Sequence, residues 1–287
     1  QQALALGRAG LDEARRLGQR HMIVTLLMNA TQSAEETGDW AWAIEALDAD
    51  SDDFEGTDRG SVLIEVARFL ALRGEPSEEV AAEVARVYGG YHDVQSIQEL
   101  EAMNALRAFA AGDLDKAFQS WLQAGHINAF APVYFLNAAR AALWAGNADR
   151  AREALTRFET AGVHGPGYHA FRRTVVAGIA ALEGRQDEAL PAYREALREW
   201  RDLGAAFDQA LVAIDMVELL PGPSADLAGI AAAARDVLVQ LQARPFIERL
   251  DAALAKMGMG AEEPADQANP APASRSRVEE SAGTGHG

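Results

Sequence analysis

The sequence predicts an all-α protein built from stacked helix pairs, and three observations carry that prediction. Alanine supplies 60 of the 287 residues, and it is the best helix former and a poor strand former. Hydrophobic residues make up 49% of the chain but aromatic residues only 7%, which favours a globular body with a tightly packed core of small side chains. In addition, a glycine-centred motif recurs at spacings of 34 to 38 residues.

Six glycines mark the repeats in chain order: Gly38, Gly74, Gly112, Gly146, Gly184 and Gly222. The spacing leaves room for two helices of ~14 residues and two short turns. Each glycine is expected to end the first helix of a pair in a left-handed conformation, which residues with a Cβ avoid. Asp39, Asp113 and Asn147 follow three of these glycines and are suited to cap the second helix.

Small and large side chains recur at fixed distances from these glycines. Seven residues before the first five glycines lie Thr31, Ala67, Ala105, Ala139 and Ala177, whereas Asp215 breaks this column at the sixth. Five residues after the four strongest glycines lie Ala43, Ala117, Ala151 and Ala189, and nine residues after them lie Leu47, Trp121, Leu155 and Tyr193. Small residues facing large ones at a fixed register are how paired helices interlock.

Three segments fall outside the repeat. The acidic stretch from Asp48 to Gly60 is expected to form a solvated loop between repeats, and Gly89-Gly90-Tyr91-His92 is expected to break a helix. Residues 258–287 are rich in Gly, Ala, Pro, Ser and Glu. We therefore expect a disordered C-terminal tail after a helical-repeat domain that covers residues 1–257.

Charge and composition disfavour several kinds of partner. Lys and Arg number 26 against 43 Asp and Glu, a net charge of −17, so nucleic acid and anionic membrane surfaces are not expected partners. The absence of cysteine excludes disulfides and thiolate metal sites. No apolar run approaches the ~18 residues of a membrane helix. Because Gln1 opens no leader segment, we expect a cytoplasmic chain cut from something longer.

The repeat resembles the tetratricopeptide family. That family shares Gly-(Asp/Asn)-x-x-x-Ala, a large apolar residue four positions later and a period of about 34 residues. Its usual Trp at the fourth position is absent here, although Phe135 occupies the position once, and the closing Pro is missing. The resemblance implies a right-handed α-solenoid of tetratricopeptide-like helix pairs.

Two segments narrow the resemblance. The last predicted helix, ARPFIERLDAAL from Ala243 to Leu254, and the preceding LGAAFDQAL from Leu203 to Leu211 are similar to the C-terminal tails of multidomain bacterial signalling proteins. In those proteins a P-loop ATPase domain is coupled to an adenylate/guanylate cyclase or a LuxR-type DNA-binding domain. The resemblance implies a sensor or scaffold part of such a protein, which contacts a protein or peptide partner or a neighbouring domain of the same chain.

No motif predicts catalysis, a cofactor or a metal. The acidic stretch fails the EF-hand pattern, because position 6 and position 12 hold Asp53 and Arg59 when counted from Asp48. His164-Gly-Pro-Gly-Tyr-His169 reads as a turn, since a metal site usually adds a third ligand. The chain contains neither a P-loop nor a Gly-x-Ser-x-Gly motif. We therefore expect a non-catalytic module for protein–protein or interdomain contact.

The first helix of each pair is expected to line a concave binding face. By register that face presents Asn29, Gln32, Arg68, Leu106, Phe109, Leu136, Arg140 and Leu143. The arginines suit carboxylates of a partner, unless they pair with the chain's own acids. An alternative is a small-molecule sensor whose pocket uses Arg140 and Trp144, one turn apart. The five tryptophans are otherwise expected in the core.

Overall fold

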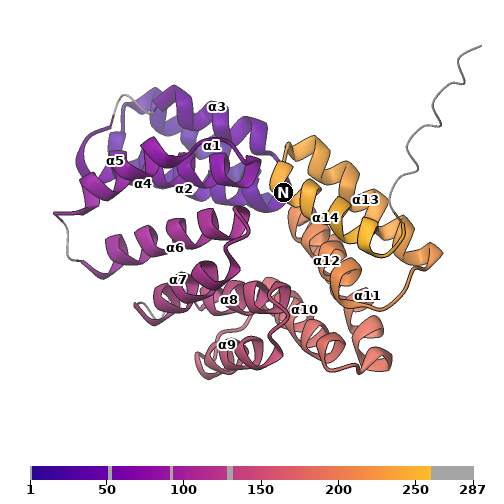
Figure 1. Ribbon diagram of the computed structural model, residues 1–287. Helices are drawn as coiled ribbons and strands as arrows, with labels where there is room; N and C mark the ends of the chain where they lie inside the picture. Colours follow the sequence, from indigo (N-terminus) through magenta and orange to yellow (C-terminus); the bar gives the residue numbers. More distant parts are fainter. Residues whose placement is uncertain (1, 51–53, 91–92, 128–131, 260–287) are drawn as a thin grey trace, which may run out of the picture.

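Regular structure in the computed structural model is entirely helical across the residues it describes, 2–50, 54–90, 93–127 and 132–259 (Figure 1). This confirms the all-α prediction. In chain order the helices are α1 (Gln2–Leu17), α2 (Arg20–Thr37), α3 (Trp40–Asp50), α4 (Gly56–Arg73), α5 (Glu78–Tyr88), α6 (Val94–Ala110), α7 (Leu114–Ile127), α8 (Val133–Trp144), α9 (Ala148–Thr160), α10 (Pro166–Leu182), α11 (Gln186–Leu203), α12 (Ala206–Leu219), α13 (Ala225–Leu241) and α14 (Arg244–Lys256).

All six predicted glycines lie between two helices and have φ values from 68° to 88°. They connect α2 to α3, α4 to α5, α6 to α7, α8 to α9, α10 to α11 and α12 to α13, with α1 before the first pair and α14 after the last. At Gly146, the glycine N–H donates to the carbonyl of Leu143 and the next N–H donates to Ala142. These bonds satisfy carbonyls that the end of α8 would otherwise leave unpaired.

The predicted columns of small and large residues are buried in the structure. The four alanines that follow the strong glycines are fully buried, as are all six residues seven positions before each glycine, Asp215 included. The large residues of the third column are also buried. Because the small side chains lie where two helices approach, they let the large ones pack against neighbouring backbone.

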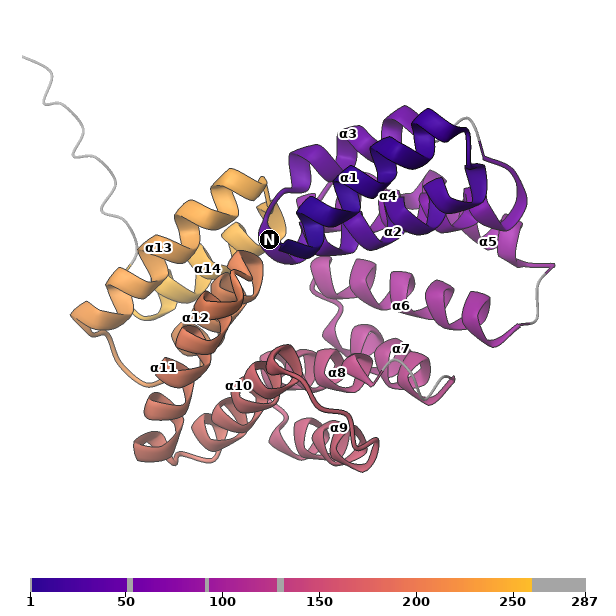
Figure 2. The same ribbon diagram turned by 180° about the vertical axis from the view of Figure 1, so that it is seen from behind.

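The chain curves round so that its last helices return to its first ones (Figures 1 and 2). Helix α12 packs against α2, and α14 packs against α4. At this closure the rings of Trp40 and Phe207 have centroids 5.0 Å apart. The backbone approach is close: a Cβ added to Gly74 would lie 2.9 Å from Cγ of Pro245. The helices therefore surround a shared interior.

Aromatic side chains from distant parts of the chain meet in that interior. Phe207 contacts Phe246 at 5.1 Å between centroids, and Phe246 in turn lies 6.0 Å from Phe109. Phe109 stacks on Trp144 at 4.4 Å. We call the connected set the central aromatic cluster, and it comprises Trp40, Phe69, Phe109, Trp121, Trp144, Phe207 and Phe246.

The structure corrects the predicted loop at Asp48 to Gly60. Helix α3 continues to Asp50 and α4 begins at Gly56, and Phe54 between them is buried. Burial of the Phe54 ring outweighs the solvation of its acidic neighbours. The predicted helix break is confirmed, since α5 ends at Tyr88 and α6 begins at Val94. Asp52, Asp53, Tyr91, His92 and the predicted tail from residue 260 onward lie outside the described residues.

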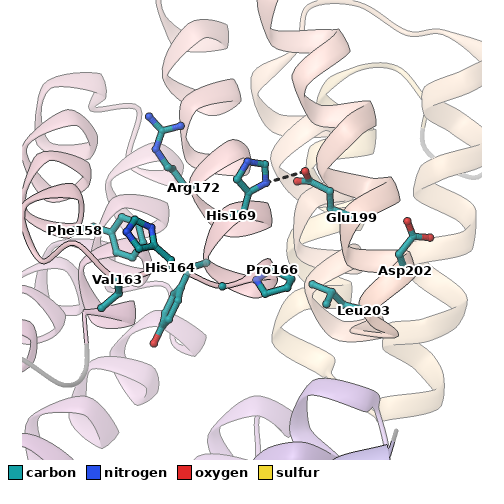
Figure 3. Close-up of a pocket in the computed structure, with 11 residues that line it drawn as sticks. Phe158, Val163, His164, Pro166, His169, Arg172, Glu199, Asp202 and Leu203 are labelled. Atoms are coloured by element: carbon teal, nitrogen blue, oxygen red, sulfur yellow. Dashed lines mark hydrogen bonds and ion pairs between the residues drawn. The ribbon is translucent and has the colours of Figure 1, made fainter.

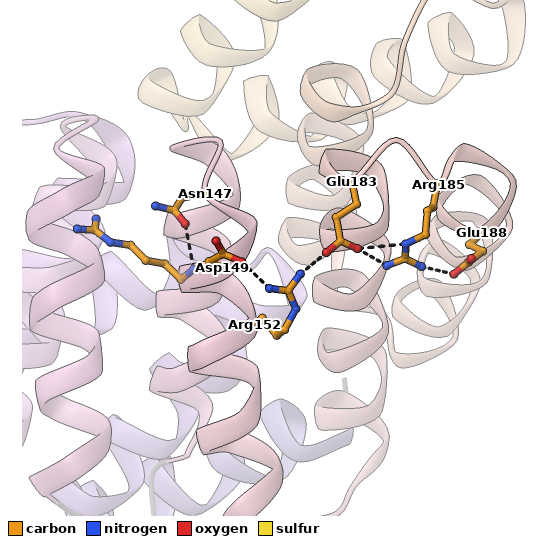
Figure 4. A network of polar contacts seen from close by, with 7 residues as sticks. Asn147, Asp149, Arg152, Glu183, Arg185 and Glu188 are labelled. Carbon is orange, nitrogen blue, oxygen red and sulfur yellow. Dashed lines mark hydrogen bonds and ion pairs between the residues drawn. The ribbon is translucent and has the colours of Figure 1, made fainter.

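Ion pairs between neighbouring repeats lie on the outer surface. Figure 4 shows Arg152 of α9 bonded to Asp149 and Glu183, while Arg185 joins Glu183 to Glu188. Such exposed pairs contribute only about 0–1 kcal/mol each, so packing decides how the repeats associate. Within the described ranges, no helix combines the length and apolarity that crossing a bilayer requires.

Gly178 tests the close approach of α8, α10 and α11. A Cβ at this position would lie 2.5 Å from Cδ1 of Leu143 and 3.0 Å from the Tyr193 hydroxyl. We expect Gly178→Ala to lower the free energy of unfolding by about 1–3 kcal/mol through overpacking, as measured by urea denaturation. Gly229→Ala is the matched control, because open space surrounds that helical glycine and the change should stabilise by about 0.5–1 kcal/mol. Equal stability of the two variants would contradict the packing described.

Candidate functional site

A cavity of about 700 Å³ lies in the interior that the closed chain surrounds. We call it the central cavity. Its walls come mainly from the first helices of the pairs, α2, α4, α6, α8, α10 and α12, with contributions from α1, α7, α11 and α14. Its aromatic lining comprises Phe109, Trp121, Tyr134, Tyr168, Phe171, Trp200, Phe207 and Phe246, and its charged lining comprises Glu35, Glu36, Arg68, Arg140 and Asp208. An apolar wall with a few polar groups is typical of a ligand pocket.

The structure brings together four of the six residues predicted to bind. Gln32, Arg68, Phe109 and Arg140 all line the central cavity, as does Leu106. Asn29 is exposed on α2 but is not part of the lining. Trp144 is buried at the other side of the central aromatic cluster, and Leu136 and Leu143 belong entirely to the core. Four of the five tryptophans are buried, and Trp42 is half-buried beneath Arg8.

Arg140 and Trp144 of α8 meet the same carboxylate on α12. Asp215 has no exposed surface, and it accepts a hydrogen bond of 2.5 Å from Nε1 of Trp144 and one of 3.4 Å from Nε of Arg140. Burial raises the pKa of Asp215, and the two donors oppose that rise. We call these three residues the Asp215 clamp. Removing one partner from such a buried ion pair leaves the other charge without compensation.

Asp208 lies about two turns earlier on α12 and faces the central cavity. Its nearest cationic atom is Nη1 of Arg140, at 3.9 Å, which is too far for a hydrogen bond. Its side chain keeps 21% of its surface exposed, and none of the described residues donates a hydrogen bond to it. Burial raises the pKa of Asp208 to about 7, because it outweighs the lowering by Arg140 and is reinforced by Glu36.

A second ion-pair cluster surrounds Arg68 at the N-terminal side of the cavity. Nη2 of Arg68 donates to Glu35 at 2.7 Å, and its Nε lies 3.5 Å from the buried Glu65. Burial raises the pKa of Glu65 to about 7, even though Arg68 lowers it. Both arginines of the cavity are therefore paired with acids of the chain itself. This is the alternative that the sequence left open to binding the carboxylates of a partner.

The predicted turn around His164 forms a smaller pocket of about 500 Å³ beside the central cavity (Figure 3). Helix α10 begins at Pro166, so His169 lies in its first turn and the turn is shorter than predicted. Nδ1 of His169 lies 2.9 Å from Glu199, and His164 and Pro166 line both this pocket and the central cavity. The described residues contain no group of three potential metal ligands.

A second cavity of about 850 Å³ lies at the other face of the central aromatic cluster, with Phe109 and Phe246 in both linings. Lys116 and Lys256 are the two lysines of the chain, and both line this cavity. Its charged lining is balanced, with Arg107, Lys116, Arg244, Arg249 and Lys256 facing Glu75, Glu78, Asp113, Glu218 and Glu248.

Sequence reasoning missed Asp208 and did not recognise the role of Asp215. The break that Asp215 makes in a column of small residues was the available signal, because a charge at a position that must be buried requires a partner. That partner, Arg140, lies 75 residues earlier in the chain, and the spacing alone does not reveal it.

The Asp215 clamp can be tested by removing its negative charge. Asp215→Asn keeps the size of the side chain but removes the carboxylate bonded to Arg140, leaving the more distant Asp208, at 3.9 Å, as its ion-pair partner. We therefore expect a loss of about 3–5 kcal/mol in the free energy of unfolding. Asp226→Asn is the control, because Asp226 pairs with Arg194 at the surface and should contribute about 0–1 kcal/mol. Similar losses in both variants, measured by urea denaturation, would rule out the clamp.

Glu65 predicts a pH dependence of stability. Its folded pKa of about 7 exceeds the ordinary 4.5, so between these values the folded state binds a proton that the unfolded state has lost. This contribution is fully present below pH 4.5 and is lost as the pH rises through 7, by up to about 3 kcal/mol. Glu65→Gln should therefore flatten the change in unfolding free energy between pH 5 and pH 7.5. Glu79→Gln, at an exposed site on α5, should leave it unchanged; a slope equal to wild type in Glu65→Gln would refute the assignment.

Comparisons with known proteins do not place this chain: no protein-family model, curated protein or solved structure matches it. The resemblance to tetratricopeptide repeats and to the tails of bacterial signalling proteins therefore stays a prediction from the residues that carry it.

Proposed function

We propose that the chain is a non-catalytic receptor module that binds a small ligand in its central cavity. The observation that carries this proposal is the central cavity itself, which combines aromatic walls with charged groups from several helices. Its volume lies within the ~300–1,000 Å³ typical of ligand pockets. The proposal assigns no catalysis, since the sequence carries neither a P-loop nor a Gly-x-Ser-x-Gly motif.

The closure of the chain favours a small ligand over a long peptide or helix. An extended partner needs an open concave face, as in stacked helical repeats. Here α12 and α14 pack against α2 and α4, and the central aromatic cluster fills the interior between the two cavities. We therefore favour the small-molecule sensor, which the sequence analysis gave as the alternative, over a module for protein contact.

The predictions of a tetratricopeptide-like solenoid and of a larger signalling protein are compatible with this proposal. Six helix–glycine–helix units at a period of 34 to 38 residues support the assignment to a right-handed, tetratricopeptide-like solenoid. As part of a larger bacterial signalling protein, the module would transmit ligand binding to an ATPase or output domain. The second cavity is the proposed contact for such a neighbour, because its lining carries cationic and acidic side chains in equal number, which can pair with charges of either sign on a protein surface.

Two neighbouring substitutions on α2 test the proposed function. Gln32 lines the central cavity and Asn29 does not, although both are exposed and lie one turn apart. A ligand of the cavity should raise the melting temperature of the wild type and of Asn29→Trp. It should not stabilise Gln32→Trp, whose indole obstructs the cavity.

The measurement is a thermal-shift screen of metabolites and short peptides on all three proteins. A compound that stabilises only the wild type and Asn29→Trp supports a cavity receptor. If every stabilising compound acts equally on Gln32→Trp, or if none stabilises the wild type, the central cavity is not the binding site.

A further inference from the structure

Two charged side chains in the central cavity have hydrogen-bonding capacity that no described residue uses. Arg140 keeps only 4% of its side chain exposed, and its Nη2 has no hydrogen-bond partner among the described residues. Asp208 is more accessible and likewise accepts no hydrogen bond from them. Burying a guanidinium donor without an acceptor is costly. Because Arg140 lines the central cavity, a ligand bound there can supply the missing acceptor.

The surroundings of Arg140 define what kind of group is missing. Asp215 engages its Nε, and Phe171 lies over the guanidinium with its ring centroid 4.6 Å from Cζ. The ring covers the face of the guanidinium but offers no acceptor in its plane. A carboxylate is the acceptor that best matches the geometry of a guanidinium edge.

The charge balance around the cavity favours a cation as well. Two guanidiniums, those of Arg68 and Arg140, lie among the carboxylates Glu35, Glu36, Glu65, Asp208 and Asp215. Carboxylates that are withdrawn from water and outnumber their cations favour the binding of a further positive charge. Asp208 is the accessible member of this set that lies nearest to Arg140.

We propose that the central cavity binds a free α-amino acid with a large apolar side chain, its carboxylate at Arg140 and its ammonium group at Asp208. This inference rests on the proposed function and names its ligand class. Nη1 of Arg140 and Oδ1 of Asp208 are 3.9 Å apart, so their ligand groups must be close neighbours, as the two charges on one α-carbon are. Tyr168, Trp200 and Phe207 of the lining supply apolar surface for the side chain.

Derivatives of two amino acids test each charge separately on the full chain. Isothermal titration calorimetry compares L-phenylalanine and L-tryptophan with their N-acetyl forms, which lack the ammonium group, and with their amides, which lack the carboxylate. We expect at least one free amino acid to bind at least tenfold more tightly than both of its derivatives. The dipeptide phenylalanyl-phenylalanine, whose charges lie on different residues, should also bind more weakly.

Asp208→Asn tests the assigned position of the ammonium group. The amide removes the charge and should weaken binding of the free amino acid at least tenfold, with little further loss for the N-acetyl form. Preference over the C-terminal amide should remain, because Arg140 is unchanged. Asp187→Asn is the matched control, since Asp187 also lies in the first turn of its helix, α11, but is exposed. Circular dichroism verifies that both variants are folded.

The proposal is overturned if neither free amino acid binds, if derivatives or dipeptide bind as tightly, or if Asp208→Asn and Asp187→Asn bind alike. These outcomes differ from failure of the proposed function, which the comparison of Gln32→Trp with Asn29→Trp decides. If a metabolite of another class stabilises the wild type but not Gln32→Trp, the proposed receptor function stands and the proposal of an amino-acid ligand is wrong.

Discussion

The closure of the chain on itself is the constraint on which the rest of this structure depends. An isolated stack of helix pairs would expose the first helix of every pair to solvent along an open face. Here Trp40 and Phe207, more than 160 residues apart, pack at 5.0 Å, and Phe246 extends the contact to Phe109. Although alanine dominates the core, its aromatic rings are thereby concentrated in the middle of the molecule. They separate the interior into two cavities whose walls derive from both ends of the chain.

Closure also explains why charge is buried in this protein. The return of α12 brings Asp208 and Asp215 toward α8, and only there does Arg140 acquire carboxylates on both sides. A buried ion pair contributes little net stability compared with apolar packing, but it is sensitive to the loss of either partner. The Asp215 clamp therefore fixes the position of α12 relative to α8. The same arrangement leaves Nη2 of Arg140 and the carboxylate of Asp208 without a hydrogen-bond partner among the described residues, beside the cavity in which we place the ligand.

Much of the fold follows from local rules that a sequence displays. Neighbours in the chain dictate where a glycine with positive φ ends a helix and where an alanine is needed at a close helix contact. The sequence therefore predicted Gly112 as a helix end, and Ala105 and Ala117 as buried small residues, correctly. Phe54 shows the limit of composition, because one ring outweighed the surrounding acids. The candidate site was predictable only in part. Gln32, Arg68 and Arg140 share the inner face of first helices, but whether that face is open depends on contacts between α2 and α12 that no local pattern encodes.

The most direct test of this account is a disulfide across the closure. The chain has no cysteine, and an ideal Cβ at Gly38 lies 3.7 Å from Cβ of Ala206, within the ~3.5–4.5 Å of disulfides. Oxidised Gly38→Cys/Ala206→Cys protein, analysed by mass spectrometry, should contain one intramolecular disulfide in nearly every molecule. Gly112→Cys/Ala206→Cys is the control, because Gly112 has a similar positive φ but no neighbour within 4 Å, and it should stay reduced within each monomer. Failure of the first pair to link, or equal linking of both pairs, would contradict a chain closed around a central cavity.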